Sequence, residues 1–185
     1  ASPRRPELLG ERGESAIVQS VDIDESKKQS ESVLTYVQRL AAEKARTGSE
    51  VIENKSQLPV LGSDTIIEFG DGILGKPVDR QQAKEMLRLL SGKKHTVHTS
   101  VAIVTVREMF MATSSTQVQF KVLEEEEIDC YLATGEADDK AGSYAIQGRA
   151  AQFINNINGS FSGVMGLPLY ETVQLLKRCG IKTLR

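Results

Sequence analysis

A small set of charged side chains has the residue types needed to bind and hydrolyse a phosphate anhydride. The set consists of Arg4, Arg5, Lys44, Lys76, Lys140, Glu25, Asp64 and Asp139. Cations that gather in one place favour a polyanion such as a phosphate chain. Carboxylates beside them favour a divalent cation, because hard cations take oxygen ligands. If these side chains come together, they predict hydrolysis of a metal-bound nucleotide. Taken one at a time, each also fits an ordinary surface salt bridge.

Lys44 stands on the apolar face of a helix that the hydrophobic spacing predicts from Ser30 onward. The face consists of Val33, Val37, Leu40, Ala41 and Lys44. This spacing is that of one side of an amphipathic helix. Two interpretations of the lysine stay open. Its long stem can cover the end of the apolar stripe while the ammonium reaches water, or the ammonium can point into a cleft at an anion.

Asp64 falls within a stretch of strand character, Val60 to Phe69, that the residues Gly62 to Thr65 interrupt. Glycine and aspartate weaken a strand interior, so we expect a break there. A carboxylate among apolar neighbours is costly to bury unless it is paired or binds a cation. The residues Gly70 to Gly72 then predict a hairpin turn into Ile73 and Leu74.

Helices and strands alternate along the rest of the chain. The spacing predicts helices over 6–12, 79–90, 124–133 and 169–179, and strands over 17–23, 96–106, 116–123 and 151–158. Asp79 and Gln82 predict a capping box at the start of the second of these helices. The alternation indicates an α/β fold, and the length of 185 residues indicates a single domain over residues 1–185.

Composition excludes several other classes of protein. The net charge is -2 and no run of Lys or Arg occurs, so we expect no nucleic-acid partner. No stretch approaches the roughly 20 apolar residues that span a membrane, so we expect no membrane partner. The two cysteines, Cys130 and Cys179, show no CxxC spacing. They are expected to be free thiols packed in the core, as in a reducing cytosol.

Two known phosphate-binding motifs match the sequence by their letters alone, and a histidine pair suggests a site that its spacing disfavours. The residues Gly70 to Gly75 match GxGxxG, but a hairpin explains them better than a strand-to-helix turn. The same stretch reads GxxxxGK up to Lys76, yet Pro77 replaces the hydroxyl residue that a phosphate-binding loop needs. His95 and His98 are three apart on a predicted strand and should point to opposite faces, which disfavours a histidine metal site or triad.

Seven sequence blocks, in order, resemble the Maf family of septum-formation-inhibitor-like nucleotide pyrophosphatases. The blocks are Ser2–Leu9, Tyr36–Ala45, Leu61–Thr65, Leu74–Pro77, Met86–Gly92, Asp139–Gly148 and Gly166–Leu169. The resemblance covers essentially the whole chain. It implies a single Maf-like α/β domain with a mixed, elongated central sheet flanked by helices, in two lobes around a positively charged cleft. It also implies a cytoplasmic protein and a homodimer.

The resemblance further implies hydrolysis of a nucleoside triphosphate to the monophosphate and pyrophosphate, with Mg²⁺ or Mn²⁺. Arg4, Lys140 and Gln147 match the branch that resembles dTTP/UTP pyrophosphatases. Two alternatives remain: a nucleotide-binding regulator of cell division without turnover, and a pyrophosphatase of purine or 7-methyl-GTP specificity.

Roles for individual residues follow from the same resemblance. Asp64 would be the proton acceptor, and Glu25 and Asp64 would hold the metal. Lys76 would act with them in catalysis. The predicted substrate-binding residues are Ser2, Arg4, Arg5, Lys44, Thr65, Lys140 and Gln147. Within this set, Lys44, Lys76 and Arg5 would bind phosphates, while Arg4, Thr65 and Gln147 would select the base.

The chain departs from the family pattern at three places, of which one, Ser63 in place of Ala in the block Leu61–Thr65, changes little. The family opens with an apolar strand and a serine two positions before the one matching Ser2, and both are absent here, so we expect a missing N-terminal strand. In the block that ends at Gln147, Ser143 and Ala145 stand where the family has Ala and Gly. The added Cβ of Ala145 must fit the loop, which bears on base selectivity.

Overall fold

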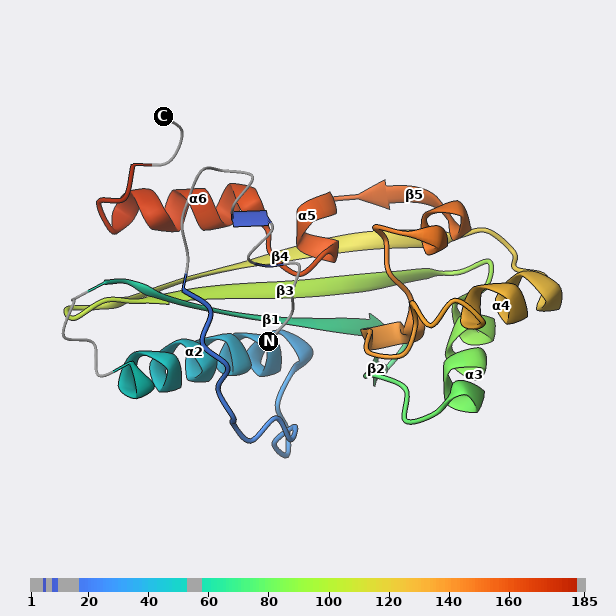
Figure 1. The fold of residues 1–185 in the computed structure, drawn as a ribbon, viewed down its shortest axis with the longest axis horizontal. Helices are drawn as coiled ribbons and strands as arrows, with labels where there is room; N and C mark the ends of the chain where they lie inside the picture. The colour runs from blue at the N-terminus through green and yellow to red at the C-terminus, as the bar shows by residue number, and fades with distance from the viewer. Residues whose placement is uncertain (1–4, 6–7, 10–16, 53–57, 183–185) are drawn as a thin grey trace. The chain divides into compact units, whose positions relative to one another are not determined.

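The computed structural model describes residues 5, 8–9, 17–52 and 58–182. An antiparallel sheet of five strands runs through it in the order β2-β1-β3-β4-β5 (Figure 1). The strands are β1 (Val60–Phe69), β2 (Gly72–Leu74), β3 (Lys94–Val104), β4 (Met109–Phe120) and β5 (Ile154–Asn158). The helices are α2 (Val33–Val51), α3 (Arg80–Leu90), α4 (Glu125–Leu132), α5 (Phe161–Val164) and α6 (Leu169–Arg178), with 3₁₀ turns η1 (Ala141–Ser143) and η2 (Arg149–Phe153). The α/β class is confirmed.

The chain divides into two compact units. The first comprises the described parts of Ala1–Thr65, Thr99–Ser114 and Gly166–Arg185, and the second comprises Ile66–His98 and Ser115–Met165. The strands β1, β3 and β4 contribute residues to both. No helix in the described ranges is both long enough and apolar enough to cross a lipid bilayer.

In the first unit, helices cover both faces of the sheet. Ala41, Ala45 and Ala102 form a buried cluster between α2 and β3, with Met109 of β4 packed against it. On α6, the guanidinium of Arg178 lies 4.3 Å from the centroid of the Phe110 ring. Adjacent residues of a strand point to opposite faces, so α2 and α6 lie on opposite sides of these strands (Figure 1).

Strand β1 is continuous, so the break expected over 62–65 is wrong. Its ten residues run from Val60 to Phe69 without interruption. Gly62 is required by the helix beside it rather than by a turn. A Cβ at Gly62 would lie 2.4 Å from both the Ala41 carbonyl oxygen and the Ala45 amide nitrogen of α2. The glycine therefore lets α2 approach β1 far more closely than any side chain would allow.

The second unit has an aromatic core beneath its part of the sheet. Phe120 and Phe153 are fully buried, and the Tyr144 ring packs edge-on against Phe120 at 4.9 Å between centroids. The helices α3 and α4 lie beside each other in this unit (Figure 1). The predicted hairpin is confirmed, since Ile67 of β1 pairs with Leu74 of β2 and Gly70 adopts a φ of 58°.

Three smaller expectations are wrong or incomplete, and a fourth is not tested. No strand forms over 17–23, where Ile17 is 88% exposed, because alternation alone makes no strand without a neighbour to pair with. Asp79 caps α3, but Gln82 accepts from the Val78 amide instead of closing a capping box. Strand β5 begins at Ile154, after a 3₁₀ turn. The helix over 6–12 lies almost wholly outside the described residues.

The cysteines are also placed differently from the prediction. Cys130 is exposed and Cys179 is half-buried, so neither belongs to the core. Both are unpaired thiols, as expected. Cys130 lies on the exposed side of α4, although Tyr131 and Leu132 after it are buried, and Cys179 is the residue that caps the end of α6.

Candidate functional site

Lys44 of α2 connects the two carboxylates predicted to hold a metal. Its Nζ donates to Asp64 Oδ1 at 2.6 Å and lies 2.6 Å from Glu25 Oε1. The side chains of Lys44 and Asp64 are only 19% and 13% exposed. Of the two interpretations left open for this lysine, the contacts with anions agree with the second, while the cleft in that interpretation stays a prediction.

The meeting of Lys44 and Asp64 follows from the packing of α2 on β1. Ser32 caps the helix by accepting from the Thr35 amide, and the buried stripe that includes Val37 and Leu40 turns Lys44 toward the sheet. Gly62 lets the helix come close, and residues two apart on a strand share a face. Asp64 therefore stands on the face of β1 that α2 covers, within reach of Lys44.

Burial and charge act in opposite directions on the two groups. Burial raises the pKa of Asp64, although the nearby charges of Lys44 and Arg5 oppose the change. Burial alone would lower the pKa of Lys44, yet its contacts with Asp64 and Glu25 outweigh burial and raise it. A carboxylate whose pKa is raised in this way is a stronger base than an exposed one.

Arg5 and Thr65 both lie against Gly166. The Arg5 Nε donates to the Gly166 carbonyl at 2.9 Å, and the Ser63 hydroxyl donates to the same oxygen at 3.0 Å. Burial lowers the pKa of Arg5, while Asp64 and Glu25 oppose that change by attraction. Gly166 has a φ of 107°, and a Cβ there would lie 3.5 Å from the Thr65 hydroxyl. The predicted residues Arg5, Asp64 and Thr65 thus belong to one cluster.

Two residues that the sequence reasoning missed hold the loop that carries Glu25. The Tyr36 hydroxyl donates to the Glu25 carbonyl oxygen. Arg39 donates to the carbonyl of Ser26 at 2.8 Å and forms an ion pair with Glu31 at 2.8 Å. Both project from α2 one or two turns before Lys44. Their spacing of three residues on one side of the predicted helix is the signal that could have found them.

In the second unit, Lys140 contacts the Asp139 carboxylate, and the charge of Lys76 also acts on it. The Gly142 amide donates to the Gly75 carbonyl at 3.0 Å, which joins the segments that carry the two lysines. Lys140 forms an ion pair with Asp139. This hydrogen bond, together with the charges of Lys140 and Lys76, lowers the pKa of Asp139. Gln147, five residues after Gly142, is exposed.

Of the predicted site residues, Ser2 and Arg4 lie outside the described part of the chain. The others fall into two groups within the described ranges. Arg5, Glu25, Lys44, Asp64 and Thr65 belong to the first unit, and Lys76, Lys140 and Gln147 belong to the second.

The donor set of the first group suits a small hard cation. Two carboxylates, Glu25 and Asp64, already approach one ammonium at 2.6 Å each. The described residues contain no cluster of three or more His, Cys, Asp or Glu that could enclose a metal ion by themselves. Mg²⁺ is typically bound by one or two carboxylates, with substrate phosphates and water completing its shell. The residues present fit that mode of binding.

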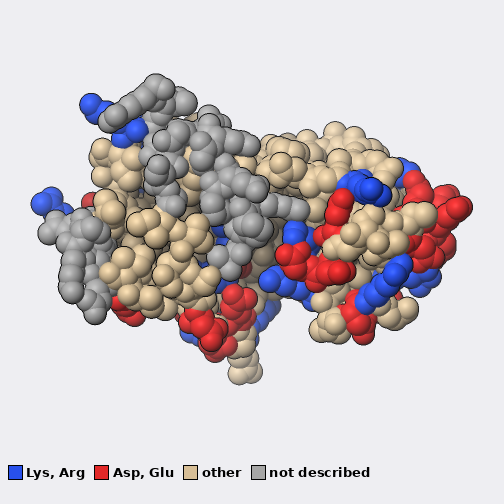
Figure 2. All heavy atoms as spheres, viewed as in Figure 1, with Lys and Arg blue, Asp and Glu red and all other residues tan. Residues whose placement is uncertain are grey.

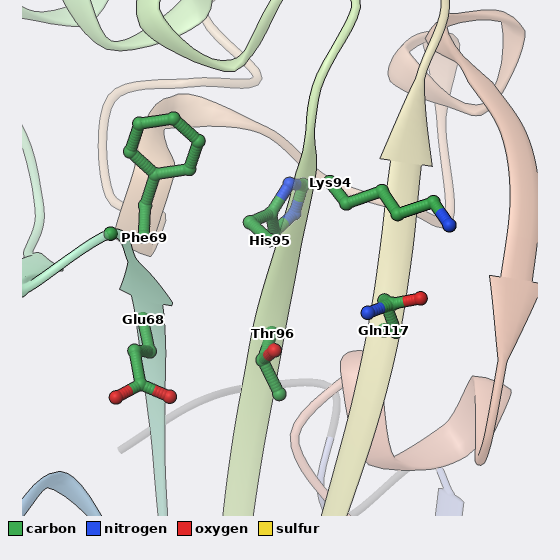
Figure 3. Close-up of a pocket in the computed structure, with 7 residues that line it drawn as sticks. Glu68, Phe69, Lys94, His95, Thr96 and Gln117 are labelled. Carbon is green, nitrogen blue, oxygen red and sulfur yellow. The ribbon is translucent and has the colours of Figure 1, made fainter.

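Two surface pockets lie within the second unit, and no site residue in the described ranges lines either. One, of about 130 Å³, is lined by Glu68, Phe69, Gly70, Lys94, His95, Thr96 and Gln117 (Figure 3). The other, of about 390 Å³, includes the carboxylates of Glu124, Glu126 and Glu127. Those three negative charges would repel a triphosphate.

The two histidines have different partners. His95 Nε2 lies 2.7 Å from the Tyr144 hydroxyl. His98 contacts the Ser115 hydroxyl at 2.8 Å and the Glu68 carboxylate at 2.9 Å. The rings therefore share no ligand, as expected for residues three apart on a strand.

Comparison with known proteins identifies close relatives over nearly the full chain. The family model described as Maf-like protein matches residues 1–179. The dTTP/UTP pyrophosphatase of Hahella chejuensis is 48% identical over 181 residues, covering 98% of this chain and 90% of that protein. Those of Aliivibrio fischeri and Shewanella sp. (strain MR-7) are 49% and 50% identical, covering 95% and 98% of this chain and 93% and 96% of theirs.

Proposed function

The chain belongs to the Maf family, and from that premise we propose that it hydrolyses dTTP and UTP to the monophosphate and pyrophosphate. Relatives of about half identity over nearly the whole chain carry that activity in their names. The observation that carries the proposal is the contact of Lys44 with Asp64, which is buried, and with Glu25, which is more exposed. It brings together a base and a cation in the place where the family resemblance puts the reaction.

In the proposed reaction, the oxygen of a water molecule bonds to the α-phosphorus while the bond to the bridging oxygen of pyrophosphate breaks. Asp64 accepts the proton from the water, and its raised pKa suits that task. Negative charge grows on the phosphoryl and leaving oxygens, so positioned cations contribute most to the rate. Lys44 and Arg5 are the cations whose charges act on Asp64.

Glu25 and Asp64 are the residues that would hold Mg²⁺ or Mn²⁺. Such an ion, when bound, supplies positive charge to the phosphates and lowers the pKa of water. Tyr36 and Arg39 fix the loop of Glu25, so this carboxylate is held in place before any ion arrives. Lys44 orients both carboxylates and balances their charge in the meantime.

We assign substrate binding in the second unit to Lys76, Lys140 and Gln147. Lys140 is paired with Asp139, whose pKa the charge of Lys76 also lowers, and both lysines would bind phosphate oxygens. Gln147 carries both a donor and an acceptor, which suits the edge of a pyrimidine. For three further residues, substrate binding stays a prediction from the family resemblance: Thr65 in the first unit, and Ser2 and Arg4 outside the described residues. The homodimer and the cytoplasmic location also stay predictions.

The test is a panel of eight ribo- and deoxyribonucleoside triphosphates, with pyrophosphate release measured in Mg²⁺, in Mn²⁺ and in EDTA. We expect dTTP and UTP to be the best substrates and EDTA to abolish release. Binding of nucleotides without release of pyrophosphate would instead identify a regulator. Preference for purine nucleotides or 7-methyl-GTP, added as a ninth substrate, would place the protein in another specificity branch.

A further inference from the structure

The segment that precedes Gln147, Tyr144 to Ile146, is buried in the core of the second unit. Tyr144, Ala145 and Ile146 are 5%, 1% and 4% exposed, whereas Gln147, the next residue, is exposed. The position of the Gln147 amide is therefore decided by the three residues before it. Whatever fixes Tyr144 to Ile146 also fixes the group that we assign to the base.

Two polar links hold this buried segment. The Tyr144 hydroxyl lies 2.7 Å from His95 Nε2 on β3. The Tyr131 hydroxyl of α4 accepts from the Ala145 amide at 3.2 Å. The backbone just before the segment is unusual, because Gly142 and Ser143 have φ values of 67° and 59°. A left-handed serine persists only where its surroundings hold it, so the loop depends on these anchors.

His95 is an unexpected residue among the aromatic rings of this core. Its ring packs edge-on against Phe120 and Tyr144 at 5.3 and 5.4 Å, and the residue is 3% exposed. Burial lowers the pKa of His95 to about 4, so the ring is neutral at pH 7. In the described part of the chain, its Nδ1 has no hydrogen-bond partner.

The hydrogen bond with Tyr144 is the interaction that an apolar ring at position 95 could not make. A buried polar atom without a partner costs free energy, so phenylalanine would serve packing better. Histidine gains only the contact of Nε2 with the Tyr144 hydroxyl. That contact joins a rigid strand, β3, to the loop that ends at Gln147.

We propose that His95 and Tyr144 form a strut that positions Gln147 and thereby sets the preference of the enzyme for pyrimidine over purine nucleotides. The inference rests on the proposed function and names His95 as a positioning residue for base selection. The strut contains no group that takes part in breaking the anhydride. Its loss should therefore act on selectivity more than on the rate with UTP.

The experiment compares His95→Phe, Tyr144→Phe and the double variant with wild type and with Gln147→Ala. We expect each single variant to lower the UTP-to-GTP ratio of kcat/KM about tenfold, with a smaller change in kcat for UTP. The double variant should be no worse than either single variant, because replacing both partners by apolar rings leaves no unpaired buried group. His95→Gln, which keeps an amide donor for the Tyr144 hydroxyl, should restore part of the ratio.

Thr116→Val is the matched control. Thr116 exchanges hydrogen bonds with Ser160 at 2.9 and 3.3 Å within the same unit, so this variant also loses a buried polar link. It should lower the melting temperature and leave the ratio unchanged. If the His95 and Tyr144 variants behave like Thr116→Val, the strut is structural only and the inference is wrong.

Dissociation constants for UTP and GTP, measured in EDTA on the same variants, separate the two proposals. An inactive wild type would contradict the proposed hydrolysis, and the ratio of these constants would still test the strut. An active wild type with unchanged ratios in all strut variants would contradict the inference alone. Loss of selectivity in Gln147→Ala but not in His95→Phe would likewise overturn the strut and leave the proposed hydrolysis standing.

Discussion

Two clusters of ion pairs in this protein have equally short distances but differ in how far their side chains are exposed to solvent. In the first unit, Lys44 lies 2.6 Å from Asp64, and the two side chains are 19% and 13% exposed. Between α3 and α4, Arg88 lies 2.6 Å from Glu125, with exposures of 45% and 58%. Figure 2 shows the basic and acidic side chains interspersed over α3 and α4. Distance alone therefore does not distinguish these two ion pairs, whereas the burial of Asp64 does.

The pKa values of the carboxylates in the two clusters are shifted in opposite directions. Burial raises the pKa of Asp64 even though Lys44 and Arg5 are near. Hydrogen bonds from Arg88 lower the pKa of Glu125 to about 2, since water still solvates that carboxylate. A buried carboxylate that holds its proton more tightly is suited to accept one during catalysis. An exposed carboxylate with a lowered pKa, such as that of Glu125, is a weaker base and is typical of a surface ion pair.

The two clusters should differ most in pyrophosphate release when the carboxylates of Asp64 and Glu125 are each replaced by the amide. Asp64→Asn removes the proposed base and should lower pyrophosphate release by about 10²- to 10⁴-fold. The circular dichroism spectrum and melting temperature should stay close to wild type, since asparagine keeps the shape. Glu125→Gln, the matched control, should keep full activity. A near-normal rate for Asp64→Asn would contradict the assignment of the base.

The second prediction concerns the packing that buries Asp64. Gly62→Ala places a methyl group 2.4 Å from backbone atoms of α2, which cannot move aside as a flexible side chain would. We expect a loss of about 2 kcal/mol or more in the free energy of unfolding, measured by urea denaturation. Gly75→Ala, where no atom lies within 4 Å of the added Cβ, should leave the unfolding free energy almost unchanged. Equal stabilities for the two variants would refute this role of Gly62.

The sequence indicates the buried cluster better than the loop that completes it. A lysine on an apolar helix face and an aspartate in an apolar strand each need a partner, and the structure pairs them. Gly62 misled the prediction, because local propensity treats a glycine in a strand as a break and carries no information on a helix packed against it. Tyr36 and Arg39 were missed because polar residues on a helix surface usually face water.

The limits of the strand prediction have a related cause. The alternation over 17–23 resembles that of a true strand, but pairing depends on a neighbour that local periodicity does not specify. The apolar run Val101–Val104 predicted β3 over nearly its full length, whereas the alternation over 116–123 predicted only the end of β4, which begins at Met109. The fold class thus follows from local patterns, whereas the Lys44–Asp64–Glu25 cluster needs contacts between distant segments.

The third prediction separates the role of Lys44 from that of Asp64 by pH. Asp64 must be ionised to act as a base, so kcat/KM should fall as pH decreases through its raised pKa. Lys44→Met removes the strongest attraction that opposes burial, so the pKa of Asp64 should rise further. We expect the acid limb of kcat/KM to move to higher pH and the rate at pH 7 to fall roughly tenfold.

Lys84→Met, in the ion-pair cluster between α3 and α4, is the control for this profile and should leave it unchanged. An acid limb at the same pH in Lys44→Met and wild type would show that another group limits the reaction. If the limb moves while the KM for UTP stays constant, Lys44 acts through Asp64 more than through the phosphates.

The smallest effect is expected from the exposed pairs of α3 and α4. Because the pKa of Glu125 is lower in the folded chain than its ordinary 4.5, its contribution to stability exists above that value and is lost as pH falls toward about 2. The group is fully exposed, so salt screens the effect. We expect Glu125→Gln to unfold at nearly the wild-type urea midpoint at pH 7 in physiological salt, with a small loss only at low ionic strength. A large loss that survives high salt would mean that this network supports the fold as the buried cluster supports the reaction.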